Sequence, residues 1–130
     1  MLKVVSTGGF GHSVFVFDEM TGMERAQLVG LAPAYAGEDI SFFTNHPLCQ
    51  GVSQYEDFRT MLETVKPDVA VISTRLDLIP ELIIEAAEAG CHIIAEKPLA
   101  PDLESLKRVE EAVKRNCRPG LALLSGAIPA

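Results

Sequence analysis

The sequence has few of the residues from which metal sites and disulfides are built. Its 130 residues include only three histidines and three cysteines, Cys49, Cys91 and Cys117. The cysteines are odd in number and far apart, with no Cys-x-x-Cys pair, which is typical of reduced thiols in a cytosol. The histidines are equally scattered. We therefore expect no structural metal.

Long apolar runs and an excess of positive charge are also missing. No stretch is long enough to span a bilayer. The first residues, "MLKVVSTGG", lack the layout of a signal peptide, so we expect a cytoplasmic protein without membrane contact. The net charge of −7 disfavours a nucleic-acid partner, because phosphates attract a basic face. A small anion remains compatible with this charge, since backbone amides can bind one locally.

What the sequence does contain is an alternation of short apolar runs and amphipathic stretches. The predicted strands are 2–7, 27–32, 67–74, 91–96 and 120–125, with a further short strand near 50–52 as the sixth candidate. The predicted helices are 12–23, 55–65, 77–89 and 102–116. Strands separated by such helices form βαβ units. The sequence therefore predicts one doubly wound, Rossmann-like α/β domain over residues 1–130, with three layers and about six parallel strands.

The segment after the first strand, "STGGFGHS", has the composition of a phosphate-binding loop. Gly8, Gly9 and Gly11 let the backbone turn sharply and approach a ligand, and the following helix, starting near His12, points N–H groups at the same place. The dinucleotide fingerprint has glycine at positions one, three and six. Here Gly8 and Gly11 fill the third and sixth positions, and Ser6 occupies the first. A glycine-rich turn that only joins strand to helix is the structural alternative.

A second part of that fingerprint is missing. The second strand should end in an acid that holds the ribose hydroxyls of the cofactor. Ala32 and Pro33 stand there instead, and the first acid is Glu38. No lysine or arginine is nearby to bind a 2′-phosphate. The residues therefore leave the choice between NAD and NADP open.

Charged residues follow two further predicted strands, in the segments "STRLD" and "EKP". Because the carboxyl ends of parallel strands share one edge of a sheet, Arg75 and Lys97 are expected to converge on one crevice. Arg75 could bind a phosphate in place of the lost ribose anchor, and a solvated loop cation is the alternative. Asp77 is predicted to cap the next helix rather than to act as a catalytic acid.

The segments "STGGFG", "PDVAVIST" and "ELIIEAAEAGCHIIAEKPLA" together resemble the nucleotide-binding domain of the glucose–fructose oxidoreductase / inositol dehydrogenase family (Gfo/Idh/MocA). The resemblance covers nearly the whole chain and is firmest from 67 to 113. It implies an NAD(P)-dependent oxidoreductase that acts on a sugar- or polyol-like substrate and can form a homo-oligomer. Family members continue into a substrate domain, so we expect the 130-residue chain alone not to turn over substrate.

By the same resemblance, the Glu-Lys-Pro turn borders the nicotinamide site, and Lys97 is the catalytic residue. A lysine there can polarise a substrate hydroxyl or relay its proton during hydride transfer. The family's Thr-Pro-Asn after the fourth strand is replaced here by "TRL". A non-catalytic module with a degenerate cofactor site is therefore the alternative function. The candidate cofactor-binding residues are Ser6, Gly8, Gly9, Phe10, Gly11, Ser73, Thr74, Arg75, Glu96 and Pro98.

Overall fold

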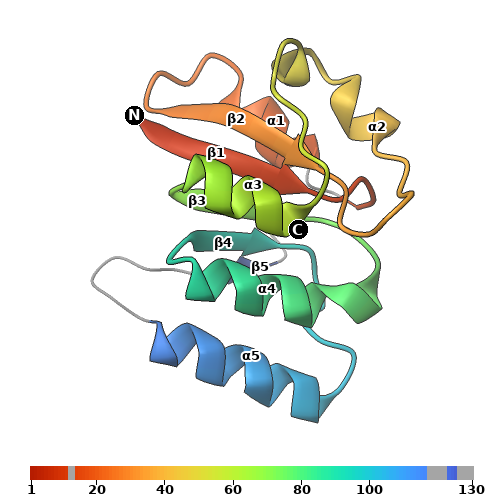
Figure 1. Ribbon diagram of the computed structural model, residues 1–130, viewed down its shortest axis with the longest axis vertical. Helices are drawn as coiled ribbons and strands as arrows, with labels where there is room; N and C mark the ends of the chain where they lie inside the picture. The colour runs from red at the N-terminus through yellow and green to blue at the C-terminus, as the bar shows by residue number, and fades with distance from the viewer. Residues whose placement is uncertain (12–13, 117–122, 126–130) are drawn as a thin grey trace.

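The computed structural model describes residues 1–11, 14–116 and 123–125. Its strands are β1 (Leu2–Thr7), β2 (Ala26–Ala32), β3 (Val69–Ile72), β4 (His92–Ala95) and β5 (Leu123–Ser125). They form one parallel sheet in the order β2-β1-β3-β4-β5, and the arrows of β1, β2 and β4 point the same way in Figure 1. The predicted parallel α/β sheet is confirmed.

Helices cover both faces of this sheet. They are α1 (Val14–Met20), α2 (Ser41–Thr44), α3 (Phe58–Val65), α4 (Ile79–Glu88) and α5 (Leu103–Arg115), with 3-10 turns η1 (Pro47–Cys49) and η2 (Leu76–Leu78). In Figure 1, α3 and α4 lie in front of the sheet and α1 lies behind it. Neighbouring residues of β1 point to opposite faces of the sheet. Val5 packs with α3 and α4 on one face, and Val4 packs with Phe17 of α1 on the other. The three predicted layers are present.

The helix ends follow from local sequence. The Asp102 carboxylate accepts a hydrogen bond from the backbone N–H of Ser105 at 2.7 Å and so caps α5. Pro80 lies in the first turn of α4, where its missing N–H costs no helical bond. Gly90 follows α4 with a φ of 81°, a left-handed conformation that glycine adopts without strain.

The strand count is lower than predicted. No strand forms at 50–52, because Pro47 starts a 3-10 turn and Gly51, at a φ of 78°, turns the chain again. The outer edge of β2 gains only a single bridge there, from Leu31 to Gln54. Within the described residues the sheet thus has five strands rather than six. Residues 120–122 of the last predicted strand, and the predicted helix start at His12, lie outside the described residues.

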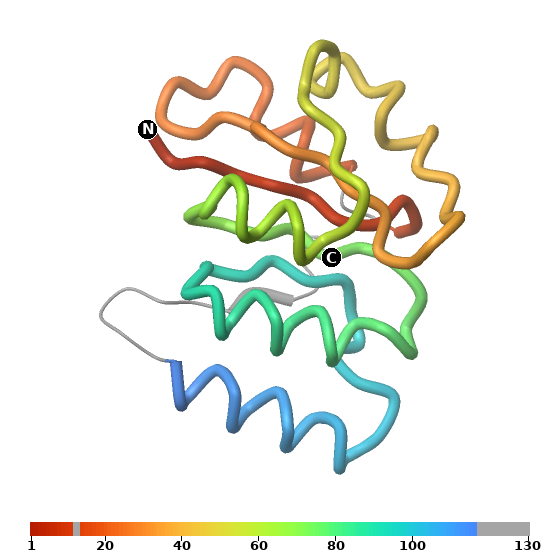
Figure 2. The backbone as a smooth tube through the Cα atoms, viewed as in Figure 1, coloured from red at the N-terminus to blue at the C-terminus, as the bar shows by residue number. Residues whose placement is uncertain are grey.

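The strand order reverses beside β1, which lies between β2 and β3. We call the four segments that follow the strands here the carboxyl edge: Gly8–Gly11 after β1, Pro33–Glu38 after β2, Ser73–Arg75 after β3 and Glu96–Pro98 after β4. The backbone trace in Figure 2 follows the chain through these turns. Doubly wound sheets bind ligands at this kind of reversal, so the fold brings the predicted site residues to the expected place.

Candidate functional site

The glycine loop packs directly against the segments that follow β3 and β4. A Cβ added to Gly8, whose φ is +93°, would lie 2.0 Å from the carbonyl oxygen of Ser73. One added to Gly11, at a φ of +119°, would lie 2.7 Å from the Ser73 hydroxyl oxygen and 2.8 Å from a carboxylate oxygen of Glu96. Larger residues therefore cannot replace these glycines without moving the loop. The packing of the protein itself already requires them.

The backbone amides of the loop are largely engaged inside the protein. The N–H groups of Gly8 and Phe10 donate to the carbonyl oxygens of Ala32 at 3.0 Å and Ser73 at 3.2 Å. Between them, the N–H of Gly9 donates to a side-chain carboxylate, that of Glu38, at 3.3 Å. Three successive amides are thus satisfied by the protein. Binding of a ligand phosphate by Gly11 and the residues after it stays a prediction.

Ser73 and Thr74 tie the neighbouring loops together. Both are buried. The Ser73 hydroxyl donates to the carbonyl oxygen of Phe10 at 2.6 Å, and the Thr74 hydroxyl donates to Glu38 at 2.9 Å. The structure therefore places both beside the glycine loop, as predicted, and shows contacts with the protein's own groups.

Glu38 is the acid that the sequence pattern missed. One of its carboxylate oxygens accepts a hydrogen bond from the N–H of Ala34 at 2.7 Å, and the other accepts the bonds from Gly9 and Thr74. The chain turns back at Gly37, whose φ is 83°, which returns the carboxylate to the end of β2. An acid expected at the last residue of the strand thus arrives six residues later, after a turn. In the sequence, the glycine directly before Glu38 was the one indication of a turn that could bring this acid back to the strand end.

Arg75 is held by Asp77 and Tyr35. Its guanidinium makes two hydrogen bonds to the Asp77 carboxylate, at 3.1 and 2.7 Å, and lies 5.0 Å from the centre of the Tyr35 ring. Hydrogen bonding between the two raises the pKa of Arg75 and lowers the pKa of Asp77. The pair is solvent-exposed and stays ionised at neutral pH.

The predicted helix-capping role of Asp77 is wrong. Residue 77 lies inside the 3-10 turn η2, and the N-cap position of α4 falls on Leu78, which makes no side-chain capping bond. The extra 3-10 turn shifts the helix start by two residues. This shift leaves the Asp77 carboxylate available to Arg75, two positions back, in the fork geometry that suits a guanidinium.

The turn after β4 exposes the side chain of Lys97, and Glu96 is partly buried. The backbone N–H of Glu96 donates to the carbonyl oxygen of Ile72 at 2.9 Å, which anchors the start of the turn to β3. The Lys97 and Pro98 side chains are exposed, and a cis peptide bond joins the two residues. Within the described residues no carboxylate forms an ion pair with Lys97. Its ammonium group is therefore available to a ligand at the carboxyl edge.

Ser6 lies in the sheet, beneath the loop. It pairs with Leu31 of β2 and Val71 of β3, and only 1% of its surface is exposed. Its hydroxyl and that of Thr7 are buried without a hydrogen-bond partner among the described groups, a cost for the fold. A contact between Ser6 and a cofactor stays a prediction, and so does one through Phe10, whose side chain is 70% exposed.

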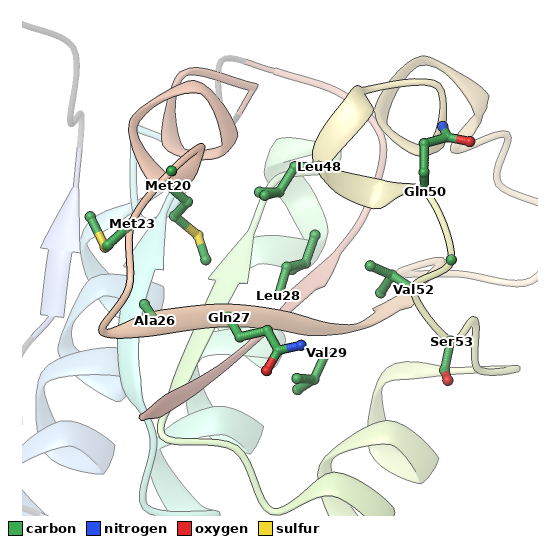
Figure 3. Close-up of a pocket in the computed structure, with 12 residues that line it drawn as sticks. Met20, Met23, Ala26, Gln27, Leu28, Val29, Leu48, Gln50, Val52 and Ser53 are labelled. Carbon is green, nitrogen blue, oxygen red and sulfur yellow. The ribbon is translucent and has the colours of Figure 1, made fainter.

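A separate hollow lies along the other half of β2. It has a volume of about 470 Å³ and is lined by Met20, Met23, Leu28, Leu48 and Val52 among others (Figure 3). None of its lining residues is titratable, so it provides no ionised acid or base. The carboxyl edge, in contrast, carries the carboxylate of Glu38, the guanidinium of Arg75 and the ammonium of Lys97.

Neither a metal-binding cluster nor a membrane-spanning helix is found among the described residues. Among them, no group of three or more histidine, cysteine, aspartate or glutamate side chains could hold a metal ion. No helix in the described part of the chain has the length and apolar character needed to cross a membrane.

Comparison with known proteins places these features in a family. Residues 8–120 match the sequence profile of the Gfo/Idh/MocA family, described as an oxidoreductase family with an NAD-binding Rossmann fold. The chain is 45% identical over 58 residues to levoglucosan dehydrogenase of Pseudarthrobacter phenanthrenivorans, covering 45% of this chain and 15% of that protein. It is 29% identical over 126 residues to glycosyl hydrolase family 109 protein 2 of Akkermansia muciniphila, covering 89% and 26%.

A solved structure shows the same arrangement. A protein of Thermotoga maritima described as an oxidoreductase superposes with a TM-score of 0.82 at 26% identity, over 96% of this chain and 38% of that one. The chain thus spans well under half the length of each of these three relatives. The family match covers most of the chain, and it agrees with the parallel sheet and the glycine loop at the strand reversal. The chain therefore belongs to the Gfo/Idh/MocA oxidoreductase family and has that family's NAD-binding Rossmann fold over residues 8–120.

Proposed function

We propose that the chain binds a nicotinamide dinucleotide along its carboxyl edge, as the cofactor domain of an oxidoreductase that acts on a sugar- or polyol-like substrate. The observation that carries the proposal is the position of the glycine loop at the strand reversal. This loop lies between the carboxylate of Glu38 on the β2 side and the turn bearing Lys97 on the β4 side. Dinucleotides cross doubly wound sheets at such reversals.

The residues present fit such a cofactor. A dinucleotide needs backbone that approaches closely, an acceptor for ribose hydroxyls and polar groups near the nicotinamide. The glycine loop brings backbone without a Cβ to the strand reversal, at Gly8, Gly9 and Gly11. Glu38 provides a carboxylate at the β2 side, and Lys97 an exposed ammonium group at the β4 side. Gly11 and Glu38 would hold the adenosine half, and Thr74 and the turn at Lys97 would border the other half.

Lys97 would act on the substrate rather than on the fold. The bound nicotinamide supplies the acceptor or donor of hydride. The ammonium of Lys97 can donate a hydrogen bond to a substrate hydroxyl oxygen and give a proton to that atom, and in its neutral amine form Lys97 can accept the hydroxyl proton instead. The names of the two curated relatives, a levoglucosan dehydrogenase and a glycosyl hydrolase, support a carbohydrate-related substrate in the complete enzyme.

A non-catalytic binding module is the second candidate. One observation favours it: the cation that follows β3, Arg75, is engaged by Asp77, so a polar group that could serve the reaction is already paired. Both candidates share the fold and the carboxyl edge, and the second has a degenerate cofactor site that binds a dinucleotide weakly. They differ in whether Lys97 contributes to hydride transfer once a substrate is present.

Titration with NADH tests the shared part of the proposal. We expect NMR amide shifts at Gly8–Gly11, Ser73–Arg75 and Glu96–Lys97, and none around the hollow beside β2. Lys97 also borders the proposed nicotinamide half, where its ammonium can donate to the cofactor, so Lys97→Met should weaken NADH binding several-fold through the loss of that charged hydrogen bond. Lys107→Met removes the same charge from an exposed position on α5 and should have no effect. Shifts confined to Met20–Val29 would contradict the proposed site.

A further inference from the structure

We propose that the outer edge of β2 is a docking site for an extended peptide segment of another protein, uncharged and with apolar side chains at alternate positions. This segment would pair with the backbone of Ala26 and Leu28 and place apolar side chains in the hollow beside them. The inference is independent of the dinucleotide binding proposed at the carboxyl edge.

The first half of the outer edge of β2 is open. β2 is the outermost strand of the sheet, beside β1. On its other side the described chain adds a single parallel bridge, in which the Leu31 N–H donates to the carbonyl oxygen of Ser53 at 3.0 Å and the Tyr55 N–H donates to that of Leu31 at 2.8 Å. Within the described residues no such partner lies beside residues 26–29. The strand sequence, "AQLVGLA", also lacks the lysine or proline that commonly blocks an unused edge.

The direction of the backbone groups in this half follows from a bond to β1. The N–H of Leu2 donates to the carbonyl oxygen of Arg25 at 2.8 Å, so the backbone groups of Arg25 face β1. Successive residues of a strand direct these groups to opposite sides. Those of Ala26 and Leu28 therefore face the outer edge, before the register of the β1–β2 pair shifts. Two N–H and two C=O groups are thus presented in the pattern to which an added strand binds.

The chain's own segment that would continue this pairing turns away. In the register of the existing bridge, residues 49–51 would lie beside residues 26–28. Instead the N–H of Val52 donates to the carbonyl oxygen of Cys49 at 3.1 Å, and Gly51 turns the chain at a φ of 78°. The place beside the strand is left as the hollow of about 470 Å³.

The lining of the hollow decides which ligand side chains it accepts. Met20 and Met23 lie on one side of it, Leu48 and Val52 on the other, and Leu28 of β2 lies between them (Figure 3). None of its lining residues is charged. A charged ligand side chain would therefore lose hydration without gaining a partner, whereas an apolar side chain gains from leaving water.

A single peptide strand fits this edge better than a second copy of the chain. The hollow lies between two walls, and a second copy would bring the same walls beside its own β2. Strand pairing between copies would also be confined to residues 26–28, because Leu31 already pairs with Gln54. So short a contact is far from the roughly 1,000 Å² that a stable interface buries. A transient peptide contact needs less area, since backbone hydrogen bonds provide its affinity.

Titration of the 130-residue chain with a capped pentapeptide, acetyl-Thr-Val-Thr-Val-Thr-amide, tests the proposal. We expect saturable NMR amide shifts at residues 26–29 and 48–52, with a dissociation constant of about 1 mM or tighter. The same peptide with proline at its centre lacks one backbone N–H and should bind at least about tenfold more weakly. Equal binding of the two peptides, shifts only elsewhere, or no saturable shift overturns the proposal.

Two variants separate the backbone contact from the side-chain contact. Ala26→Pro removes an outward N–H and leaves the bonds to β1, so it should weaken binding of the first peptide several-fold. Met23→Lys adds a charge beside the hollow, at a side chain that is 49% exposed, and should also weaken binding several-fold. Leu103→Lys makes a similar change at an exposed side chain of α5 and should have no effect. Full affinity of Ala26→Pro or Met23→Lys contradicts the proposed site.

Amide hydrogen exchange gives an independent readout that needs no variant to fold. In the free chain the N–H groups of Ala26 and Leu28 should exchange faster than that of Gln27, which faces β1, and the peptide should slow both. Exchange that the saturating peptide leaves unchanged would exclude strand pairing. Protection of Ala26 and Leu28 that grows with the concentration of the chain alone would assign the edge to a second copy and overturn the proposal of a peptide.

Discussion

The two halves of the carboxyl edge are built differently. After β1, β2 and β3, the loops are joined by side chains: Glu38 bonds to two other loops, and Ser73 bonds to the glycine loop. After β4, a backbone bond from Glu96 anchors the turn, and the side chain of Lys97 is exposed. The first half is held by side-chain bonds between loops, and the second presents the exposed side chain of Lys97.

This difference matches the two tasks of a dinucleotide site. Binding a rigid part of a cofactor benefits from groups that are already in place, since less ordering is needed on association. A group that donates or accepts a proton must instead reach a substrate whose position changes during the reaction. We therefore expect substitutions in the first half to affect stability and cofactor choice, and substitutions at Lys97 to affect ligand contact.

The largest effect should come from the closest packing in the first half. Gly8→Ala places a Cβ 2.0 Å from the carbonyl oxygen of Ser73 at a φ of +93°, so the free energy of unfolding should fall by about 3–5 kcal/mol. Gly37→Ala has a similar φ, +83°, with open space around the added Cβ, and should cost about 1–2 kcal/mol of strain. Urea unfolding of both variants measures the difference. Equal losses would mean that conformation, not packing, requires Gly8.

A smaller effect is expected from releasing Arg75, the cation of the first half, from its ion pair with Asp77. Asp77→Asn removes the charge that engages Arg75, so the guanidinium becomes available to a phosphate. NADPH binding should tighten several-fold, and NADH binding should change less. Isothermal titration measures both. The double variant Asp77→Asn/Arg75→Ala should lose the gain, and a gain that survives would assign the effect to another group.

The smallest effect concerns the N-caps of α3 and α5, and we expect the two caps to contribute similarly to stability. Asp57 caps α3 and Asp102 caps α5, each accepting a backbone N–H at 2.7 Å. These bonds, from Thr60 and Ser105, lower the pKa of both carboxyls. Their stabilisation is therefore complete above the unfolded pKa of about 3.9 and is lost as the pH falls through the lower folded pKa.

Unfolding curves between about pH 5 and pH 2 measure this loss. Asp57→Asn and Asp102→Asn keep a capping side chain that does not titrate, so each should flatten part of the pH dependence by a similar, small amount. If only one variant flattens the pH dependence, the two capping carboxylates contribute unequally to the free energy of unfolding.

Much of the fold could be read from local sequence, because the signals act within one element. The β-branched run "LKVVST" forms β1, Pro80 starts α4, and Asp102 caps α5. Each depends on a backbone preference or on a contact within three residues. The sixth strand near 50–52 was predicted wrongly: the stretch Gln50-Gly51-Val52 is not an apolar run, and Gly51 turns the chain there at a φ of 78°.

The site was only partly readable for a related reason. Sequence by itself determined that glycines follow β1 and that Arg75 and Lys97 follow β3 and β4, because strand order and loop position suffice for that. Only the tertiary structure decided that Glu38 returns to the end of β2, since the return depends on a turn at Gly37 and on donors 29 and 36 residues away. It also decided that Asp77 engages Arg75 instead of capping α4. The bonds of Glu38 form only after the sheet has brought the loops together, so no local pattern encodes them. The bond between Arg75 and Asp77 spans two residues, and Asp77 is available to it because the 3-10 turn η2 moves the N-cap position to Leu78.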